Sequence, residues 1–355
     1  GLFVLGPDCG TAILDGVPLG FANAVPRGRI GLVAASGTGL QEVTCRLAAE
    51  GEGVSHAIGV GGRDLSDAVG GATTLRALDA LAADPATHVV VLVGKPPGGT
   101  VAQRLSEALP ALGKPVVAAA ASTGMTGGGL FEAAGPPHAR STVLLAPTLE
   151  DAALAAVALA RGQAPRPVEF SLPAAEIERL VAVLAAPLAA GQRFVRGVYS
   201  GGTLAWEALG LLRARLPDVA PGVHGEGTGH RVVDLGEDVF TVGRPHPMID
   251  GSVRRDWLLR EATDPGVTVL LLDVVLGWGA HPDPAGELVP ALDEARRAAG
   301  GRALAVIASV TGTERDPQVR SAQVSTLRAA GVAVMESNAQ AARLAARVAE
   351  RAAAS

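Results

Sequence analysis

The sequence predicts an α/β protein built from two doubly wound parallel-sheet domains. Continuous runs of Val, Ile, Leu and Ala alternate with amphipathic helical patterns along most of the 355 residues. Uninterrupted apolar strands of this kind are expected where helices cover both faces of a sheet. The alternation breaks at a proline-containing stretch, residues 163–172, and then starts again. A chain of this length with one such break favours two domains.

The first domain is expected over residues 29–162 and the second over residues 193–355, with residues 163–192 as a linker and helix. Residues 1–28 are interpreted as a connector from a domain that precedes them. In the first domain we expect strands at 29–35, 54–60, 88–94, 115–121 and 142–146, and helices at 38–50, 67–83, 100–112 and 148–161. In the second we expect strands at 193–199, 231–235, 238–242, 267–275, 303–309 and 332–335, and helices at 203–215, 253–263, 286–299, 316–330 and 338–352. Each series is typical of a flavodoxin-like unit, in which ligands bind beyond the carboxyl ends of the strands.

Composition excludes several classes of function. The net charge is −5 and no basic stripe is present, which argues against a nucleic-acid partner. No apolar run reaches the roughly 18 residues that a membrane span needs. The two cysteines, Cys9 and Cys45, predict neither a disulfide framework nor a metal site, and they fit a reducing cytoplasm.

Two short turns are the first candidates for a binding site. Each follows a predicted strand, reads Ser-Gly-(Gly)-Thr and opens a predicted helix, so its free N–H groups and the helix dipole can hold an anion. The anion-binding candidates in these turns are Ser36, Gly37, Thr38, Ser200, Gly201, Gly202 and Thr203. The alternative is that Ser or Thr only caps the helix, with Glu42 and Glu207 completing capping boxes.

Charged residues near strand ends give further candidates. Lys95 follows the strand at 88–94 and precedes two prolines, so it is expected to bind a phosphate or a carboxylate unless it is a solvated loop residue. Arg244 and His246 share one proline-framed loop, where arginine can bind a carboxylate and histidine can transfer a proton. The alternative for this loop is an exposed polar turn.

Asp273 interrupts the apolar strand at 267–275 and therefore needs a partner, for which the candidates are a helix N-terminus, Arg244 or a ligand. His281 and Asp283 are too few to form a metal site. Asp64 either holds its own loop or contacts substrate. No metal and no certain cofactor are expected.

Several of these motifs resemble the succinyl-CoA synthetase family. Residues 6–9 (Gly-Pro-Asp-Cys), 29–42 and 59–62 (Gly-Val-Gly-Gly) resemble the ligase half of the α subunit. Residues 200–202, 232–236 and 271–275 resemble the carboxy-terminal domain of the β subunit. In that family two helix N-termini, one from each domain, face each other and grip a phosphorylated histidine. The resemblance places these helix starts at the two Ser-Gly turns.

The chain departs from this family at two places. The loop at 124–129 reads Gly-Met-Thr-Gly-Gly-Gly and has no histidine where the family has its phosphorylated one, and Lys95 replaces a glutamate. A base in place of an acid suits a free anion. No stretch resembles the family's CoA-binding domain or its ATP-grasp domain.

The fusion of α-like and β-like halves, together with the motifs at 243–250 and 273–284, resembles the FdrA family, some of whose members form the large subunit of oxamate carbamoyltransferase. This resemblance implies one subunit of a hetero-oligomeric carbamoyl- or acyl-phosphate transferase. Phosphate and oxalurate would give carbamoyl phosphate and oxamate, with Lys95 and Arg244 on the carboxylate or oxyanion and His246 as proton carrier. The alternatives are an NDP-forming acyl-CoA ligase, which would use CoA, and a non-catalytic scaffold subunit.

Overall fold

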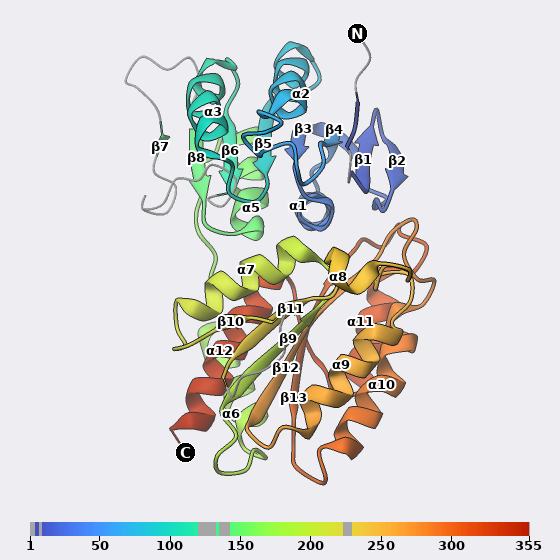
Figure 1. The fold of residues 1–355 in the computed structure, drawn as a ribbon. Coiled ribbons are helices and arrows are strands. Elements are labelled where there is room, and N and C mark those ends of the chain that lie inside the picture. Colours follow the sequence, from blue (N-terminus) through green and yellow to red (C-terminus); the bar gives the residue numbers. More distant parts are fainter. Residues whose placement is uncertain (1–3, 7–8, 120–132, 135–142, 223–228, 355) are drawn as a thin grey trace. The chain divides into compact units, whose positions relative to one another are not determined.

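The protein is described by a computed structural model that covers residues 4–6, 9–119, 133–134, 143–222 and 229–354. It forms two compact units, Gly1–Val168 with Gly277–Gly279 and Glu169–Leu276 with Ala280–Ser355. Each unit contains one β-sheet with helices on both faces (Figure 1). Within the described helices, none is both long enough and apolar enough to cross a membrane.

The first unit has a sheet in the order β2-β1-β4-β3-β5-β6-β8-β7. Its strands are β1 (Thr11–Leu14), β2 (Val17–Gly20), β3 (Arg27–Ala34), β4 (Val54–Gly59), β5 (Val89–Val93), β6 (Val116–Ala119), β7 (Ala133–Ala134) and β8 (Val143–Ala146). Its helices are α1 (Gly37–Ala49), α2 (Ala72–Ala83), α3 (Gly99–Ala111) and α5 (Leu149–Ala160). The five central strands are parallel. Their order is the second, first, third, fourth and fifth along the chain, which is the flavodoxin-like order that the sequence predicts.

A hairpin extends this sheet where the sequence analysis expected a connector. Strands β1 and β2 pair through a two-residue turn in which Asp15 and Gly16 both have positive φ, 53° and 82°. An Asp-Gly pair is the usual choice for such a turn because both positions need a left-handed backbone. β1 then runs antiparallel to β4, with Ile13 opposite Ala57. The hairpin signal was present in the sequence, and the sheet is mixed at this edge.

The helix expected at 67–83 begins later, at Ala72. Gly70 and Gly71 have positive φ and interrupt the helical pattern. The buried carboxylate of Asp64 accepts hydrogen bonds from the N–H groups of Thr73 (3.0 Å) and Thr74 (2.8 Å), so it caps α2. Of the two roles considered for Asp64, its contacts are therefore those of a residue that holds its own loop.

The second unit has a sheet in the order β10-β11-β9-β12-β13-β14. Its strands are β9 (Phe194–Tyr199), β10 (Ala220–Pro221), β11 (Arg231–Asp234), β12 (Val267–Val275), β13 (Ala305–Thr311) and β14 (Ala333–Met335). Its helices are α6 (Ala174–Ala185), α7 (Gly202–Arg213), α8 (Asp238–Thr241), α9 (Ser252–Thr263), α10 (Pro284–Ala298), α11 (Arg320–Ala329) and α12 (Asn338–Ala353). Strands β11-β9-β12-β13-β14 are parallel and repeat the flavodoxin-like order.

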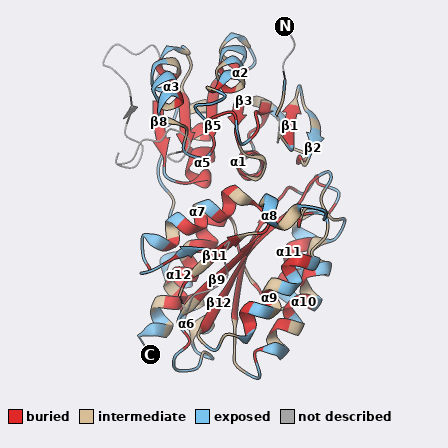
Figure 2. Ribbon diagram, in the orientation of Figure 1, coloured by how far each residue is buried: buried red, intermediate tan, exposed pale blue. Residues whose placement is uncertain are grey.

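Helices cover both faces of this second sheet. α7 packs with α12, which also contacts α6, while α9, α10 and α11 pack in a row (Figure 1). All nine residues of β12 are buried as a result (Figure 2). A parallel strand covered on both faces needs apolar side chains on both, which accounts for the continuous apolar run in its sequence.

The strand expected at 238–242 is wrong, because residues Asp238–Thr241 form the short helix α8. The β-branched and aromatic residues of this segment favour a strand, but β10 already pairs with the outer side of β11. A single helical turn instead places the ring of Phe240 against Trp257, with the two ring centroids 5.7 Å apart. Val239 and Val242, the other apolar residues of the segment, stay exposed.

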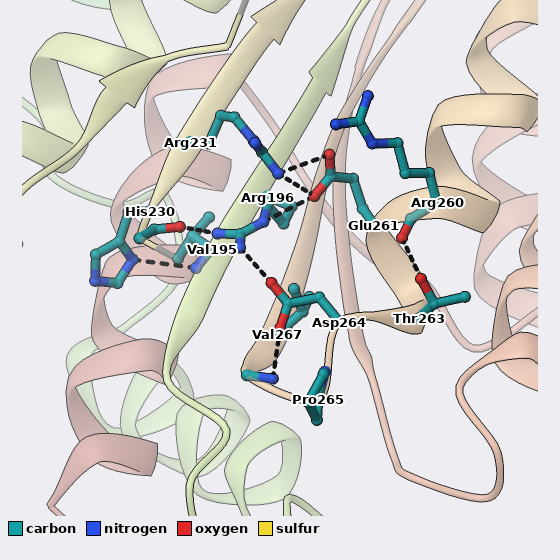
Figure 3. A network of polar contacts seen from close by, with 12 residues as sticks. Val195, Arg196, His230, Arg231, Arg260, Glu261, Thr263, Asp264, Pro265 and Val267 are labelled. Carbon is teal, nitrogen blue, oxygen red and sulfur yellow. Dashed lines mark hydrogen bonds and ion pairs between the residues drawn. The ribbon is translucent and has the colours of Figure 1, made fainter. Parts of the chain in front are cut away.

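A buried ionic network fixes α9 to the sheet at the edge where the strands begin (Figure 3). Arg196 of β9 donates hydrogen bonds to Glu261 (2.8 Å) and to Asp264 (2.6 Å). Arg231 of β11 also donates to Glu261, at 2.8 Å. The network contains two positive and two negative groups, so its buried charges are paired. The network therefore anchors the last turn of α9 at the edge of the sheet where the strands begin. The first turn of α9 lies at the opposite edge, where the strands end.

Candidate functional site

In each unit the chain builds the sheet first to one side of the first parallel strand and then to the other. In open parallel sheets, ligands bind in the crevice at this switch point, beyond the carboxyl ends of the strands. In the second unit it lies between β9 and β12, where the turn at Ser200 and the side chain of Asp273 are found. In the first unit it lies between β3 and β5, where the turn at Ser36 and the loop of Lys95 are found. The parallel register therefore brings the predicted candidates of each unit to the same edge of its sheet.

An internal carboxylate occupies the start of α7. Asp273 is fully buried, and its two oxygens accept hydrogen bonds from the backbone N–H groups of Ser200 (2.9 Å) and Gly201 (2.8 Å). The Ser200 hydroxyl lies 3.1 Å from the same carboxylate. The N–H groups that the sequence analysis assigned to a ligand are thus used by the protein itself. Of the partners considered for Asp273, it has the helix N-terminus.

The cation beside Asp273 is Arg254 and not Arg244. Arg254 lies in the first turn of α9, its side chain is 9% exposed, and its guanidinium donates to Asp273. The same nitrogen also lies 3.2 Å from the Ser200 hydroxyl oxygen. Arg244 lies in an exposed turn, where its backbone N–H donates to the carbonyl of Thr241 at 3.1 Å. Sequence reasoning missed Arg254 because nothing in its local pattern distinguishes it from the neighbouring surface arginine, Arg255.

A second carboxylate lies against the same helix start. A Cβ placed on Gly202 would come within 2.4 Å of Asp234 Oδ2, so this carboxylate lies directly against the first residue of α7. Thr203, the next residue, is 9% exposed. The α7 start therefore meets two carboxylates and one guanidinium, which leaves little net positive charge for a free anion.

His246 lies beside this group. Its Nδ1 accepts a hydrogen bond from the N–H of Met248 at 3.2 Å, so we assign the proton of the neutral ring to Nε2. A Cβ placed on Gly236 would lie 2.8 Å from His246 Nε2, 2.8 Å from the Ser200 carbonyl oxygen and 3.1 Å from Asp234 Oδ1. Nε2, a backbone carbonyl and a carboxylate oxygen thus all lie around Gly236. This arrangement suits a hydrogen-bond donor, and it does not suit a group that takes up a proton at Nδ1.

Three other histidines have the same tautomer, with Nδ1 as the acceptor and the proton on Nε2. Nδ1 of His56 accepts from Asp15 N–H, that of His230 from Val195 N–H, and that of His281 from Asp283 N–H, at 3.0–3.1 Å. A histidine can take a phosphoryl group at Nε2 only through a free lone pair on that nitrogen. These four rings are therefore not arranged to be phosphorylated at Nε2.

The start of α1 differs from that of α7. Ser36 caps the helix by accepting the N–H of Gly39 at 3.0 Å, and no acidic residue lies in the first turn. A side chain on Gly37 would come within 3.0 Å of the Thr11 hydroxyl. The N–H of Ala35 donates to the carbonyl of Val93 at 2.9 Å, which places the helix start beside the end of β5. Thr38 follows in the first turn of this helix.

Lys95 lies two residues beyond Val93 and is exposed. It is therefore a cation near a positive helix start, in a part of the unit where the first helical turn carries no acid. That the start of α1 binds an anion stays a prediction. That the starts of α1 and α7 bind one anion together also stays a prediction.

A small, partly open hollow lies in the second unit next to Ser200. It lies at the carboxyl end of β12, between that strand, the loop before α9, and helices α9 and α10. Its lining residues are Ser200, Pro247, Met248, Gly251, Arg254, Arg255, Val274, Val275, Pro284, Glu287, Leu288 and Ala291. The walls combine apolar side chains with polar groups at Arg254, Arg255, Ser200 and Glu287.

The described part of the chain holds no group of three or more His, Cys, Asp or Glu that could bind a metal ion. Asp283 instead caps α10 by accepting the N–H of Gly286 at 3.0 Å. The glycine-rich loop at 124–129 lies outside the described residues.

Comparison with known proteins identifies the class of the second unit. Residues 198–348 match the CoA-ligase family, so this unit carries a CoA-ligase domain of the succinyl-CoA synthetase type. The whole chain is homologous to the uncharacterized protein YahF of Escherichia coli (strain K12), with 39% identity over 95% of this chain and 65% of YahF. The FdrA family is not named by these comparisons.

Shorter matches link the chain to ligase subunits. It is 37% identical over 31% of its length to the ADP-forming sulfoacetate-CoA ligase subunit SauD of Bilophila wadsworthia, covering 36% of that protein. It is 34% identical over 32% of its length to the succinate–CoA ligase [ADP-forming] subunit alpha of Staphylococcus aureus, covering 37% of that subunit. The chain thus spans under two thirds of the length of the curated relatives that it matches.

Proposed function

We propose that this chain is a subunit of an NDP-forming acyl-CoA ligase, in which a small carboxylic acid is converted into its CoA thioester through an acyl phosphate. The observation that carries this proposal is the CoA-ligase domain at residues 198–348, on a sheet whose carboxyl edge collects Ser200, Asp273 and Arg254. The relatives that are named as ligases are subunits, so a partner would supply the nucleotide site. Such an enzyme would work in the cytoplasm, where the thiols of Cys9 and Cys45 stay reduced.

Within this proposal the first unit binds the phosphate group. The start of α1, with the N–H groups of Gly37 and Thr38, would hold the phosphate oxygens, and Lys95 would add a point charge. In the second unit Asp273 and Arg254 fix the turn before α7, and His246, whose Nδ1 accepts the N–H of Met248, would donate a hydrogen bond from Nε2. Arg244 would act from the surface, on the part of the substrate or partner that reaches it.

A second candidate is the carbamoyl- or acyl-phosphate transfer of the oxamate carbamoyltransferase type that the FdrA resemblance implies. Two observations favour it: Lys95 stands in place of a glutamate, and the four histidines with known ring contacts have Nδ1 as an acceptor. In this reaction a phosphate oxygen attacks the carbamoyl carbon of oxalurate, the C–N bond to the oxamate nitrogen breaks, and that nitrogen takes a proton. No phosphorylated histidine is required.

The two candidates are separated by their partial reactions. The full chain is purified through a tag, so that any subunit assembled with it is retained, and is given acyl-CoA thioesters and inorganic phosphate. A phosphate oxygen attacks the thioester carbonyl, the C–S bond breaks and CoA leaves as its thiolate. Phosphate-dependent thiol release supports the ligase. If thiol release is absent while oxalurate and phosphate give carbamoyl phosphate, the transferase replaces it.

Lys95→Ala tests the anion site in whichever reaction is found. If the ammonium of Lys95 contacts a bound phosphate, its loss should raise the KM for phosphate by about tenfold or more, because a charge-assisted contact is removed. Arg297→Ala, which removes an exposed charge from α10, is the matched control and should change neither constant. If Lys95→Ala and Arg244→Ala both leave turnover intact, the chain is a scaffold subunit.

A further inference from the structure

The turn before α7 holds a set of donors that together fit one anion. The backbone N–H groups of Ser200 and Gly201 donate to the two oxygens of Asp273 at 2.9 and 2.8 Å. The Ser200 hydroxyl lies 3.2 and 3.1 Å from the same two oxygens, and the guanidinium of Arg254 donates to one of them. Backbone N–H groups at a helix start, together with an arginine, are the donors that proteins use to bind free oxyanions.

The anion in this site belongs to the chain itself. Asp273 is the only charged residue of β12, whose other residues are Val, Leu and Thr. Its backbone pairs with Ser309 of β13 on one side, and on the other side β9 pairs with β12 up to the preceding residue, Leu272. Because the strand is held on both sides, the carboxylate cannot leave these donors without loss of strand pairing. Asp273 therefore occupies the position of a ligand permanently.

The site is closed around this carboxylate. Asp273 is 0% exposed, Ser200 2% and Arg254 8%. A carboxylate that has lost its water is costly unless an opposite charge and hydrogen bonds replace the solvent, and the donors of this turn do so. Ser200 and Arg254 also line the small hollow beside them. The hollow gives small ions a route to these donors when the side chain at position 273 is shorter.

From these contacts we infer that the turn before α7 is an anion-binding site whose anion the chain supplies itself, and that residue 273 determines whether a free anion can enter. Asp273 closes the site in this chain. A small neutral residue at the same position opens it to a free carboxylate of the size of formate. The inference goes beyond the ligase proposal and does not depend on it. In the proposed ligase it would confine free phosphate to the first unit.

Chemical rescue of Asp273→Ala tests the inference. Alanine keeps the Cβ and removes the carboxylate, so formate has the size of the missing group. Formate far above its dissociation constant should raise the melting temperature of this variant by about 5 °C or more, because a ligand that binds only the folded state stabilises it. The wild type, whose site is filled, should show no such rise. Acetate, which is one methyl group larger, should stabilise Asp273→Ala less than formate does.

The matched control is Asp273→Asn. It loses the same charge, but its amide still fills the site, so formate should not stabilise it. The double variant Asp273→Ala/Arg254→Met lacks the guanidinium and should lose the response to formate. Equal responses of Asp273→Ala and Asp273→Asn, an undiminished response in the double variant, or no response of Asp273→Ala would each overturn the inference.

If Asp273→Ala does not fold without an added anion, the yield of folded protein after dilution from urea, with and without formate, is measured instead. A yield that formate does not raise would also overturn the inference. Neither readout needs CoA or a partner subunit. Absence of thioester chemistry would therefore remove the proposed function alone, and absence of rescue by formate would remove this inference alone.

Discussion

The guanidinium of Arg254 donates to the carboxylate of Asp273 in the interior of the second unit, where the two side chains are 9% and 0% exposed. Asp273 in turn accepts the N–H groups of Ser200 and Gly201. An internal ion pair therefore sets the conformation of the turn before α7, in the position where the sequence suggested that a ligand anion would bind.

This ion pair predicts a strongly non-additive pair of mutations. Asp273→Asn keeps the shape but leaves Arg254 as an uncompensated buried charge, which should lower the free energy of unfolding by about 3–5 kcal/mol. Arg254→Met alone should cost a similar amount, because Asp273 then loses its cation. The double variant should cost clearly less than the sum, and urea unfolding of all four proteins measures the coupling. Additive effects would mean that the two groups do not depend on each other.

The network around Glu261 offers a test of buried against exposed ion pairs within one helix-and-sheet unit. Glu261 is 2% exposed and accepts from both Arg196 and Arg231. Glu261→Gln should destabilise the second unit by about 3 kcal/mol or more, because Arg231 loses its anion and the buried Arg196 keeps only Asp264. The matched change Glu294→Gln, in an ion pair whose side chains are 50% and 31% exposed, should cost about 1 kcal/mol or less. Equal losses of unfolding free energy in the two variants would contradict the expectation that the buried network of Figure 3 contributes more than an exposed ion pair.

His230 predicts a pH dependence of stability. Burial, and then the nearby Arg196, lower the pKa of this histidine below its ordinary value of 6.5. Below pH 6.5 the unfolded chain binds the proton more readily than the folded chain, so stability falls as the pH drops from 6.5 through the folded pKa. His230→Asn keeps an acceptor for the N–H of Val195 and removes the titration, and it should flatten this part of the curve of melting temperature against pH.

The control for this prediction is His56→Asn, which also keeps an acceptor for its backbone donor, Asp15 N–H. This variant should leave unchanged the fall in melting temperature with pH that comes from His230. An unaltered curve in His230→Asn would assign the acid sensitivity to other groups.

Two glycines should respond to alanine in opposite directions. A Cβ on Gly236 would lie 2.8 Å from the Ser200 carbonyl oxygen, which is backbone and cannot move cheaply, so Gly236→Ala should destabilise the site by about 1–3 kcal/mol. Gly210, inside α7, has open space at its Cβ position, and Gly210→Ala should stabilise by about 0.5–1 kcal/mol through helix propensity. Thermal unfolding of both variants measures this. A neutral Gly236→Ala would show that the contacts of His246 and Asp234 around it are loose.

The local patterns of the sequence determined the two flavodoxin-like sheets, since a strand covered on both faces must be apolar throughout, and β12 is predicted at its observed residues 267–275. They also determined which residues reach the carboxyl edges, because parallel strands all end there. The order of pairing that brings Asp273 to Ser200, 73 residues away, was decided only by tertiary structure. So was the choice of Arg254 over Arg244, and so was α8, because a side chain's partner depends on how helices pack over the sheet and not on its own neighbours in sequence.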